Sequence, residues 1–151
     1  MRGSSTSILT TNELTTNEQG GIMPAYSFGF SSFGVPDIDA ARQFYGEVLG
    51  LDVRDEDMGQ LSISLPGGSW MLLYPKPDYV PATSTTLSLV VDDIDAAVDD
   101  LVARGIEFVR YEGFEQDDRA ISRGIAKGQG PDIAWCTDPF GTIISVLQNA
   151  E

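Results

Sequence analysis

The sequence predicts an α+β fold made of two tandem modules, each consisting of one strand, one helix and three further strands. The pentad Asp-Ile-Asp-Ala-Ala occurs at residues 37–41 and again at 93–97. Each copy is followed by a helical apolar stripe that ends before a glycine, Gly50 or Gly105. Later in each copy, Pro66-Gly67-Gly68 and Pro139-Phe140-Gly141 precede an apolar strand. Such matched segments indicate one supersecondary unit used twice.

The first module is expected to span residues 25–76. Its first strand begins at about Ala25 and contains Phe28, Phe30 and Phe33, because strands are rich in aromatic residues. Asp37 is a good N-cap for the helix that follows. The apolar stripe of this helix is Ala41, Phe44, Tyr45, Val48 and Leu49. Strands at about 51–55, 60–65 and 69–75 complete the module, and a turn at 66–68 joins the last two.

The second module is expected to span residues 85–148, after a proline-containing connector at 77–84. Its first strand, 85–91, alternates between apolar Leu87 and Leu89 and polar Thr86 and Ser88. A helix at 94–104 and a strand at 106–111 follow. The polar segment 112–131 is long for a loop inside a domain, which is typical of functional or disordered loops. Strands at about 132–137 and 142–148 close a single domain that covers residues 25–148.

Residues 1–24 are expected to form a disordered tail outside this domain. They are mostly Ser, Thr, Asn, Gln and Gly, and Leu-Thr-Thr-Asn-Glu occurs twice in tandem at 9–13 and 14–18. Such a segment buries too little apolar surface to offset the entropy lost on ordering.

Composition excludes several classes of function. The chain has 151 residues and a net charge of −14, so it repels nucleic acids and anionic membrane surfaces and attracts cationic ligands. It contains no histidine, which removes the commonest metal ligand and general base. Its single cysteine, Cys136, cannot form an internal disulfide and is expected to be an inert buried thiol. A soluble protein of a reducing compartment, the cytoplasm, is predicted.

The chain resembles the vicinal oxygen chelate superfamily, which contains glyoxalase I, bleomycin-resistance proteins and extradiol dioxygenases. The resemblance rests on the two modules, Phe44-Tyr45, Leu49-Gly50-Leu51, the Val-x-Asp entry to each helix and Asp138-Pro139-Phe140-Gly141. It implies sheets that curl around a shared cleft with the helices outside, and a homodimer.

Family enzymes carry metal ligands on the first and last strands of each module. Counting from the repeat places these positions at Phe30, Leu72, Thr86 and Ser145. Phenyl, isobutyl and neutral hydroxyl groups do not form a ligand set for a divalent cation. The resemblance therefore points to the metal-free, bleomycin-resistance type, with no metal, no cofactor and no catalytic residue.

The face opposite the helices is expected to line the cleft and bind a small aromatic or cationic molecule. The candidate ligand-binding residues are Phe28, Phe30, Ser32, Trp70, Leu72, Tyr74, Thr86, Ser88, Trp135 and Ser145. Tyr111 is a second candidate for stacking on a ligand. The alternative interpretation is that the apolar members are simply core. Phe114, Arg119 and Arg123 are candidates for a mobile lid, or belong to an ordinary solvated loop.

Two other functions stay open at this point. One is a glyoxalase-like lyase or dioxygenase-type enzyme with an atypical site, in which Glu107 or Glu112 would act as base. The other is a regulatory or interaction module without a ligand. The aspartate pairs 37/39 and 93/95 are expected to be helix caps and first-turn anions rather than catalytic dyads.

Overall fold

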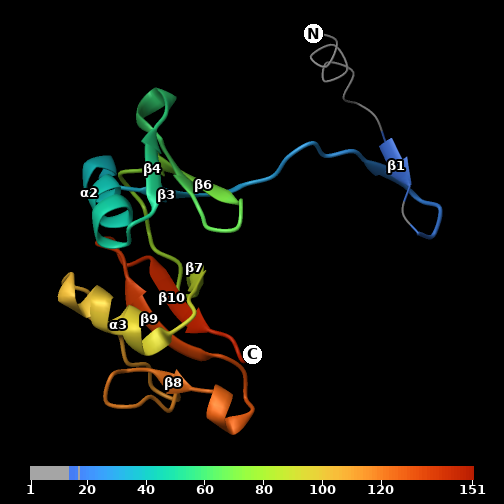
Figure 1. Ribbon diagram of the computed structural model, residues 1–151. Helices are drawn as coiled ribbons and strands as arrows, with labels where there is room; N and C mark the ends of the chain where they lie inside the picture. The colour runs from blue at the N-terminus through green and yellow to red at the C-terminus, as the bar shows by residue number, and fades with distance from the viewer. Residues whose placement is uncertain (1–13, 17) are drawn as a thin grey trace. The chain divides into compact units, whose positions relative to one another are not determined.

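Two four-stranded mixed sheets and two helices form the body of the protein in the computed structural model (Figure 1), which describes residues 14–16 and 18–151. The chain separates into two compact units, Met1–Phe30 and Ser31–Glu151. The second unit contains both sheets, one from each predicted module. The α+β fold with two tandem modules is thereby confirmed.

The first module comprises β3 (Ser31–Val35), α2 (Ile38–Gln43) with the π-helical turn Phe44–Val48, β4 (Asp52–Asp55), β5 (Leu61–Ser64) and β6 (Trp70–Pro75). A 3-10 turn, Asp57–Gly59, lies between β4 and β5. The strand order is β3-β6-β5-β4, and only the β3–β6 pair is parallel.

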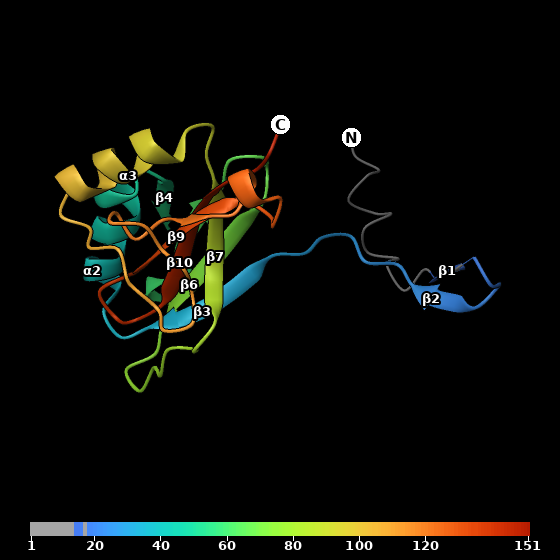
Figure 2. The same ribbon diagram turned by 90° about the horizontal axis from the view of Figure 1, so that it is seen from below.

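The second module repeats this topology with β7 (Thr85–Val90), α3 (Ile94–Ala103), β8 (Ser122–Arg123), β9 (Asp132–Thr137) and β10 (Ile143–Gln148). A 3-10 turn, Ile125–Lys127, precedes β9. The order is β7-β10-β9-β8, and only the β7–β10 pair is parallel. In Figures 1 and 2, α2 and α3 lie on the same side of the two sheets.

The repeated pentads begin both helices, as predicted. The Asp37 carboxylate accepts a hydrogen bond from the Ala40 N–H, and the Asp93 carboxylate accepts one from the Ala96 N–H. The first helix has one residue more than the second before its terminal glycine. A π-turn absorbs a single inserted residue, and the hydrogen bond from the Leu49 N–H to the Phe44 carbonyl closes this turn at 2.9 Å.

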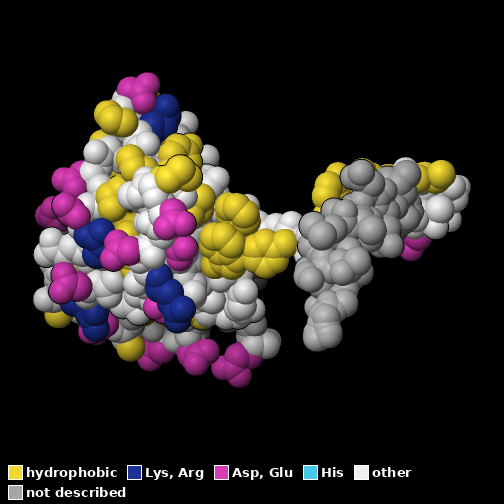
Figure 3. Space-filling view, turned by 90° about the horizontal axis from the view of Figure 1, so that it is seen from above, with side chains coloured by type: hydrophobic (Ala, Val, Ile, Leu, Met, Phe, Trp, Pro, Cys, Tyr) yellow, Lys and Arg dark blue, Asp and Glu magenta, His cyan; other side chains and the backbone are white. Residues whose placement is uncertain are grey.

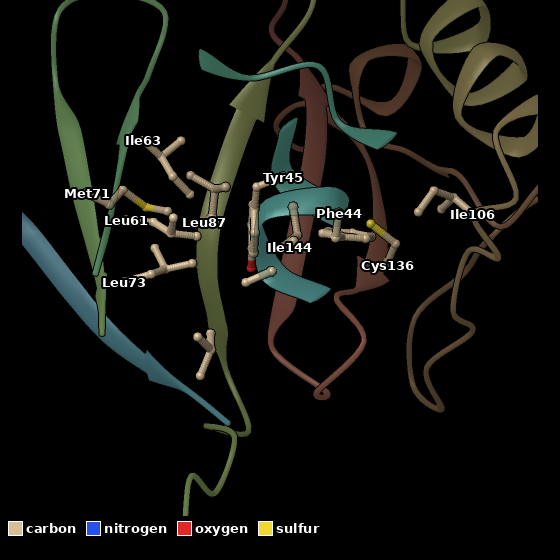
Figure 4. Packing of buried hydrophobic residues seen from close by; sticks show 12 residues of the cluster. Phe44, Tyr45, Leu61, Ile63, Met71, Leu73, Leu87, Ile106, Cys136 and Ile144 are labelled. Atoms are coloured by element: carbon tan, nitrogen blue, oxygen red, sulfur yellow. The ribbon is translucent and has the colours of Figure 1, made fainter. Parts of the chain in front are cut away.

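One hydrophobic cluster crosses both modules. Leu61, Ile63, Met71 and Leu73 form the buried face of the first sheet. Figure 4 shows Leu87 of the second module beside them, with Tyr45 next to Leu87. The cluster continues through Phe44 and Ile144 to Cys136 and Ile106. Burial and the neighbouring Asp138 charge raise the pKa of the Cys136 thiol to about 11, so this thiol stays protonated and unreactive at neutral pH.

A buried polar contact joins the two modules beside this cluster. The Tyr45 hydroxyl donates to Asp138 Oδ2 at 2.8 Å, and the backbone N–H groups of Phe140 and Thr142 donate to Asp138 Oδ1 at 2.9 Å each. Asp138 is only 4% exposed. Burial, followed by the charge and hydrogen bond of Asp138, raises the pKa of Tyr45 far above its ordinary value. The contact fixes the turn between β9 and β10 to the first helix.

The first strand begins later than predicted, at Ser31 rather than at about Ala25. Ser31 already pairs with Met71, near the start of β6. A longer β3 would need partners beyond Trp70, where the chain turns through Gly67 and Gly68. Phe28 and Phe30 therefore lie outside the strand, and the expectation that they share a face with Ser32 is wrong.

The strand predicted at 106–111 is also wrong, since only Val109 pairs with β9, through an isolated bridge to Trp135. Ser122 of β8 pairs with Ile133 on the same strand. Two separate pieces of the chain thus share the outer edge of β9. The segment 112–131, expected to be a loop, supplies the fourth strand of the sheet.

Within the segment where disorder was expected, β1 (Leu14–Thr16) pairs antiparallel with β2 (Ile22–Pro24). A two-stranded hairpin is at best marginally stable in water. Residues 1–13 and 17, which the same expectation covers, lie outside the described residues. Among the described residues, no helix is long and apolar enough to cross a membrane.

Candidate functional site

The second sheet carries an aromatic pocket on the face opposite the core. Its volume is about 320 Å³, which falls in the range of small-molecule sites. Its lining residues are Thr83, Ser84, Thr85, Tyr111, Phe114, Trp135 and Ile143. We refer to this site as the aromatic pocket.

Three rings pack against one another in this pocket. The Tyr111 and Trp135 rings meet edge to face, with centroids 5.6 Å apart and an interplanar angle of 84°. The Phe114 ring lies 5.1 Å from Trp135 and 6.5 Å from Tyr111. Phe114 is 56% exposed, although aromatic side chains usually bury most of their surface. The pocket is therefore open to solvent beside an incompletely covered aromatic cluster.

The sheet topology explains how these distant residues meet. β10 lies between β7 and β9. Ile143 pairs with Thr85 on one side, and Ser145, two residues further along β10, pairs with Trp135 on the other. On the outer edge of β9, the Val109 N–H donates to the Trp135 carbonyl at 2.8 Å. This bridge brings Tyr111 and Phe114 over the indole ring.

The connector forms the polar wall of the pocket. The Tyr79 hydroxyl is hydrogen bonded to Thr142 Oγ1 at 2.9 Å. Pro81 lies against Gly141 so closely that a Cβ at that glycine would be 3.1 Å from Pro81 Cγ. These two contacts hold the connector against the β9–β10 turn, and they place Thr83 and Ser84 at the rim.

Of the residues that the structure describes, none with a charged side chain lines the aromatic pocket. Its polar groups are the hydroxyls of Thr83, Ser84, Thr85 and Tyr111, which can both donate and accept hydrogen bonds. Charge acts on the site from a distance, through the net charge of −14. On the face shown in Figure 3, basic side chains lie beside acidic ones. Arg42, for example, forms ion pairs with Asp39 and Asp55.

The polar segment after Phe114 is tied to α3 by ion pairs. Asp95 Oδ1 accepts from Arg119 Nη1 at 2.6 Å and from Arg123 Nη2 at 2.7 Å. Arg123 Nε also donates to Asp117 Oδ2 at 2.9 Å, and Arg119 contacts Asp99. The two arginines considered for a lid are thus engaged with acidic groups of α3 and of their own segment. Phe114, the third lid candidate, packs on Trp135 instead.

Acid is expected to release this segment from α3. The hydrogen bond from Arg123, with both neighbouring guanidinium charges, lowers the pKa of Asp95 against the opposing effect of burial. Because the pKa of Asp95 is lower in the folded protein than its ordinary value of 3.8, the charged carboxylate stabilises the fold above pH 3.8. This stabilisation is lost as the pH falls through the lowered pKa. Amide NMR signals of residues 119–123 should therefore change as the pH falls through the lowered pKa of Asp95.

The Asp95→Asn variant should show altered signals for these residues already at neutral pH. The matched control is Asp39→Asn, the equivalent position of the first pentad, which should leave them unchanged. Wild-type signals in Asp95→Asn at neutral pH would contradict this role of the ion pairs.

The sequence-predicted site residues do not form one cluster. Trp135 lines the aromatic pocket, whereas Trp70 lines a separate hollow of about 330 Å³ on the first sheet with Arg54, Glu56, Ser62 and Ser64. Phe28 and Phe30 belong to the first compact unit, where they are 64% and 51% exposed, with ring centroids 6.2 Å apart. The other predicted residues lie on β3, β6, β7 and β10, namely Ser32, Leu72, Tyr74, Thr86, Ser88 and Ser145.

The positions predicted from the repeat as equivalent to family metal ligands do not pair with one another across the strands. Leu72 pairs with Ser32 rather than Phe30, and Ser145 pairs with Ser88 rather than Thr86. The Ser145 hydroxyl donates to Ser88 Oγ at 2.8 Å. Three neutral hydroxyls and one alkyl group do not fit a divalent cation. In the part of the chain that the structure describes, no three His, Cys, Asp or Glu residues gather as a metal site.

Several residues of the pocket were missed by sequence reasoning. Thr83 and Ser84 belong to the connector, where prolines are the dominant signal. Glu107 and Glu112, considered as catalytic bases, are exposed, and neither of these described residues lines the aromatic pocket.

The fold is similar to that of several solved structures. A protein from Bacillus anthracis assigned to the glyoxalase family is 21% identical, with a TM-score of 0.61, covering 85% of this chain and 100% of that chain. TnmS3, an antibiotic binding protein from Streptomyces sp. CB03234, is 24% identical, with a TM-score of 0.57, covering 83% and 100%. A glyoxalase/dioxygenase from Nostoc punctiforme is 20% identical, with a TM-score of 0.57, covering 80% and 88%.

At these identities the likeness establishes the fold and not the activity. A search of curated proteins found no match to the chain. The model of the Glyoxalase/Bleomycin resistance protein/Dioxygenase superfamily matches residues 28–146, which is most of the chain and includes both modules. The protein therefore belongs to the Glyoxalase/Bleomycin resistance protein/Dioxygenase superfamily.

Proposed function

We propose that the protein binds a small planar aromatic molecule in the aromatic pocket and sequesters it without a metal ion or other cofactor. The observation that carries this proposal is the cluster of Tyr111, Phe114 and Trp135 around an open pocket of about 320 Å³. Aromatic rings offer a large apolar surface and attract planar or cationic ligands through their faces. The hydroxyls of the opposite wall orient polar substituents.

Positively charged ligands should associate faster with the protein than neutral ones. The net charge of −14 raises the local concentration of cations and their rate of association. The solved structure of TnmS3, an antibiotic binding protein, has a similar fold. That likeness supports an antibiotic or a similar organic compound as the ligand and resistance by sequestration as a role.

The chemistry of Leu72 and Ser145 and of their strand partners supports binding without a metal. Ser32, Ser88 and Ser145 offer only neutral hydroxyl oxygens, and Leu72 offers no donor. Members of the superfamily often form dimers, so we propose a homodimer. Light scattering coupled to size-exclusion chromatography tests this. The unpaired, buried Cys136 supports a reducing compartment, the cytoplasm.

Titration of the Trp70→Phe variant with proflavine, a planar aromatic cation, tests the proposed function. The chain has two tryptophans, so this variant keeps Trp135 as its only indole reporter. Saturable quenching of Trp135 fluorescence is expected, with a Kd of about 1–100 μM.

Acridine, the uncharged counterpart of proflavine at mildly alkaline pH, serves as the matched probe. It should bind with a weaker dependence on salt, because only the cation is attracted by the protein's net charge. Quenching that does not saturate with either compound would contradict the proposed function.

A further inference from the structure

We propose that Gln116 is the positioning residue of the aromatic pocket. It holds the turn that carries Tyr111 and Phe114, so that both rings are in place over Trp135 before a ligand arrives. This inference rests on the proposed function of the same pocket. Gln116 does not line the pocket, so it acts through the two aromatic residues.

The Gln116 carboxamide makes three hydrogen bonds to the backbone. Its Oε1 accepts from the Tyr111 N–H at 2.8 Å. Its Nε2 donates to the Val109 carbonyl at 3.0 Å and to the Ala120 carbonyl at 2.8 Å. The side chain thus uses its acceptor and both donor hydrogens, and it ties the two ends of the segment 109–120 together.

Residues 117–120 are held by hydrogen bonds of Asp117 and by the ion pairs of Arg119. Residues 110–116 have few other means of holding their shape. Beyond the isolated bridge at Val109, the described residues 110–120 contain no helix or strand. The hydrogen bond from the Phe114 N–H to the Tyr111 carbonyl is long, at 3.3 Å. Arg110 reaches the Asp117 carbonyl at 2.7 Å, but its side chain is on the exposed side. The hydrogen bonds of the half-buried Gln116 side chain are therefore the main contacts that hold the turn.

The consequence for binding is a preorganised aromatic wall. A ligand that meets rings already in position does not have to supply the free energy needed to order the turn. Without the carboxamide, the Tyr111 N–H and two carbonyls lose their partners, and unpaired backbone groups favour conformations that reach water. Tyr111 and Phe114 would then sample positions away from Trp135.

Gln116→Met keeps the length of the side chain and removes all three hydrogen bonds. In the Trp70→Phe background it should accelerate amide hydrogen exchange at Tyr111 by about tenfold or more, leaving Val146 in β10 unchanged. Acrylamide quenching of Trp135 should increase, and the Kd for proflavine should rise by about fivefold or more. Gln129→Met, at an exposed position, is the matched control and should change none of these quantities.

Gln116→Glu, which keeps the acceptor oxygen and loses both donors, provides a second variant if the methionine variant does not fold. It should change the same quantities in the same direction. Unchanged exchange at Tyr111, or accelerated exchange with an unchanged Kd for proflavine, would overturn the positioning role. If the parent protein binds no probe, the proposed function fails. Faster exchange at Tyr111 with greater quenching of Trp135 would then still support the positioning role, and unchanged exchange would overturn it.

Discussion

Replacing Asp138 with alanine is expected to lower the free energy of unfolding by about 3–5 kcal/mol. The carboxylate accepts hydrogen bonds from the Tyr45 hydroxyl and from the N–H groups of Phe140 and Thr142. Tyr45 and Thr142 are fully buried, so their donors would be left without water or protein partners. Urea unfolding followed by circular dichroism measures the loss.

Two further variants separate this effect from a simple loss of charge. Tyr45→Phe removes the hydroxyl that donates to Asp138, and should lower the free energy of unfolding by about 1–2 kcal/mol. Asp118 is exposed. The free energy of unfolding of Asp118→Ala should therefore stay within about 0.5 kcal/mol of that of the parent protein. A loss below about 1 kcal/mol for Asp138→Ala would show that the contact does not hold the modules together.

Replacing Trp135 with leucine is expected to weaken proflavine binding by at least about tenfold, which corresponds to about 1.4 kcal/mol. Trp135 contacts both other rings of the pocket. Leucine keeps an apolar group on β9 and removes the planar surface on which a ligand stacks. Isothermal titration calorimetry is the appropriate measurement, because the variant lacks the fluorescent reporter.

Trp70→Phe is the matched control for this prediction, because Trp70 lies in a separate hollow on the equivalent sheet of the first module. It should change the Kd by less than about twofold. Equal losses in the two variants would mean that both tryptophans belong to one site, as the sequence alone had suggested.

Local sequence patterns predicted most of the fold. Alternation along 85–90 placed Leu87 in the core and left Thr86 and Ser88 exposed, and the pentads marked both helix starts. The β8 strand was not predictable, because Ser122–Arg123 has no apolar pattern of its own. Its position depends on the ion pairs of Arg123 and on the free outer edge of β9.

The candidate site was predictable only in part, because strand order rather than local periodicity brings its residues together. Tyr111 and Trp135 were recognised as aromatic candidates, and both line the pocket. Thr83 meets them only because β10 lies between β7 and β9. Strand register was not predictable by counting residues, since Ser145 pairs with Ser88 and not with Thr86.

The location of a bound ligand tests the central claim most directly. Trp70 and Trp135 give two indole N–H signals in a two-dimensional NMR spectrum, and the Trp70→Phe variant assigns them. During titration with proflavine, the Trp135 signal should shift and saturate while the Trp70 signal stays in place. A saturating shift of Trp70 with an unchanged Trp135 signal would contradict the assignment of binding to the aromatic pocket of the second module.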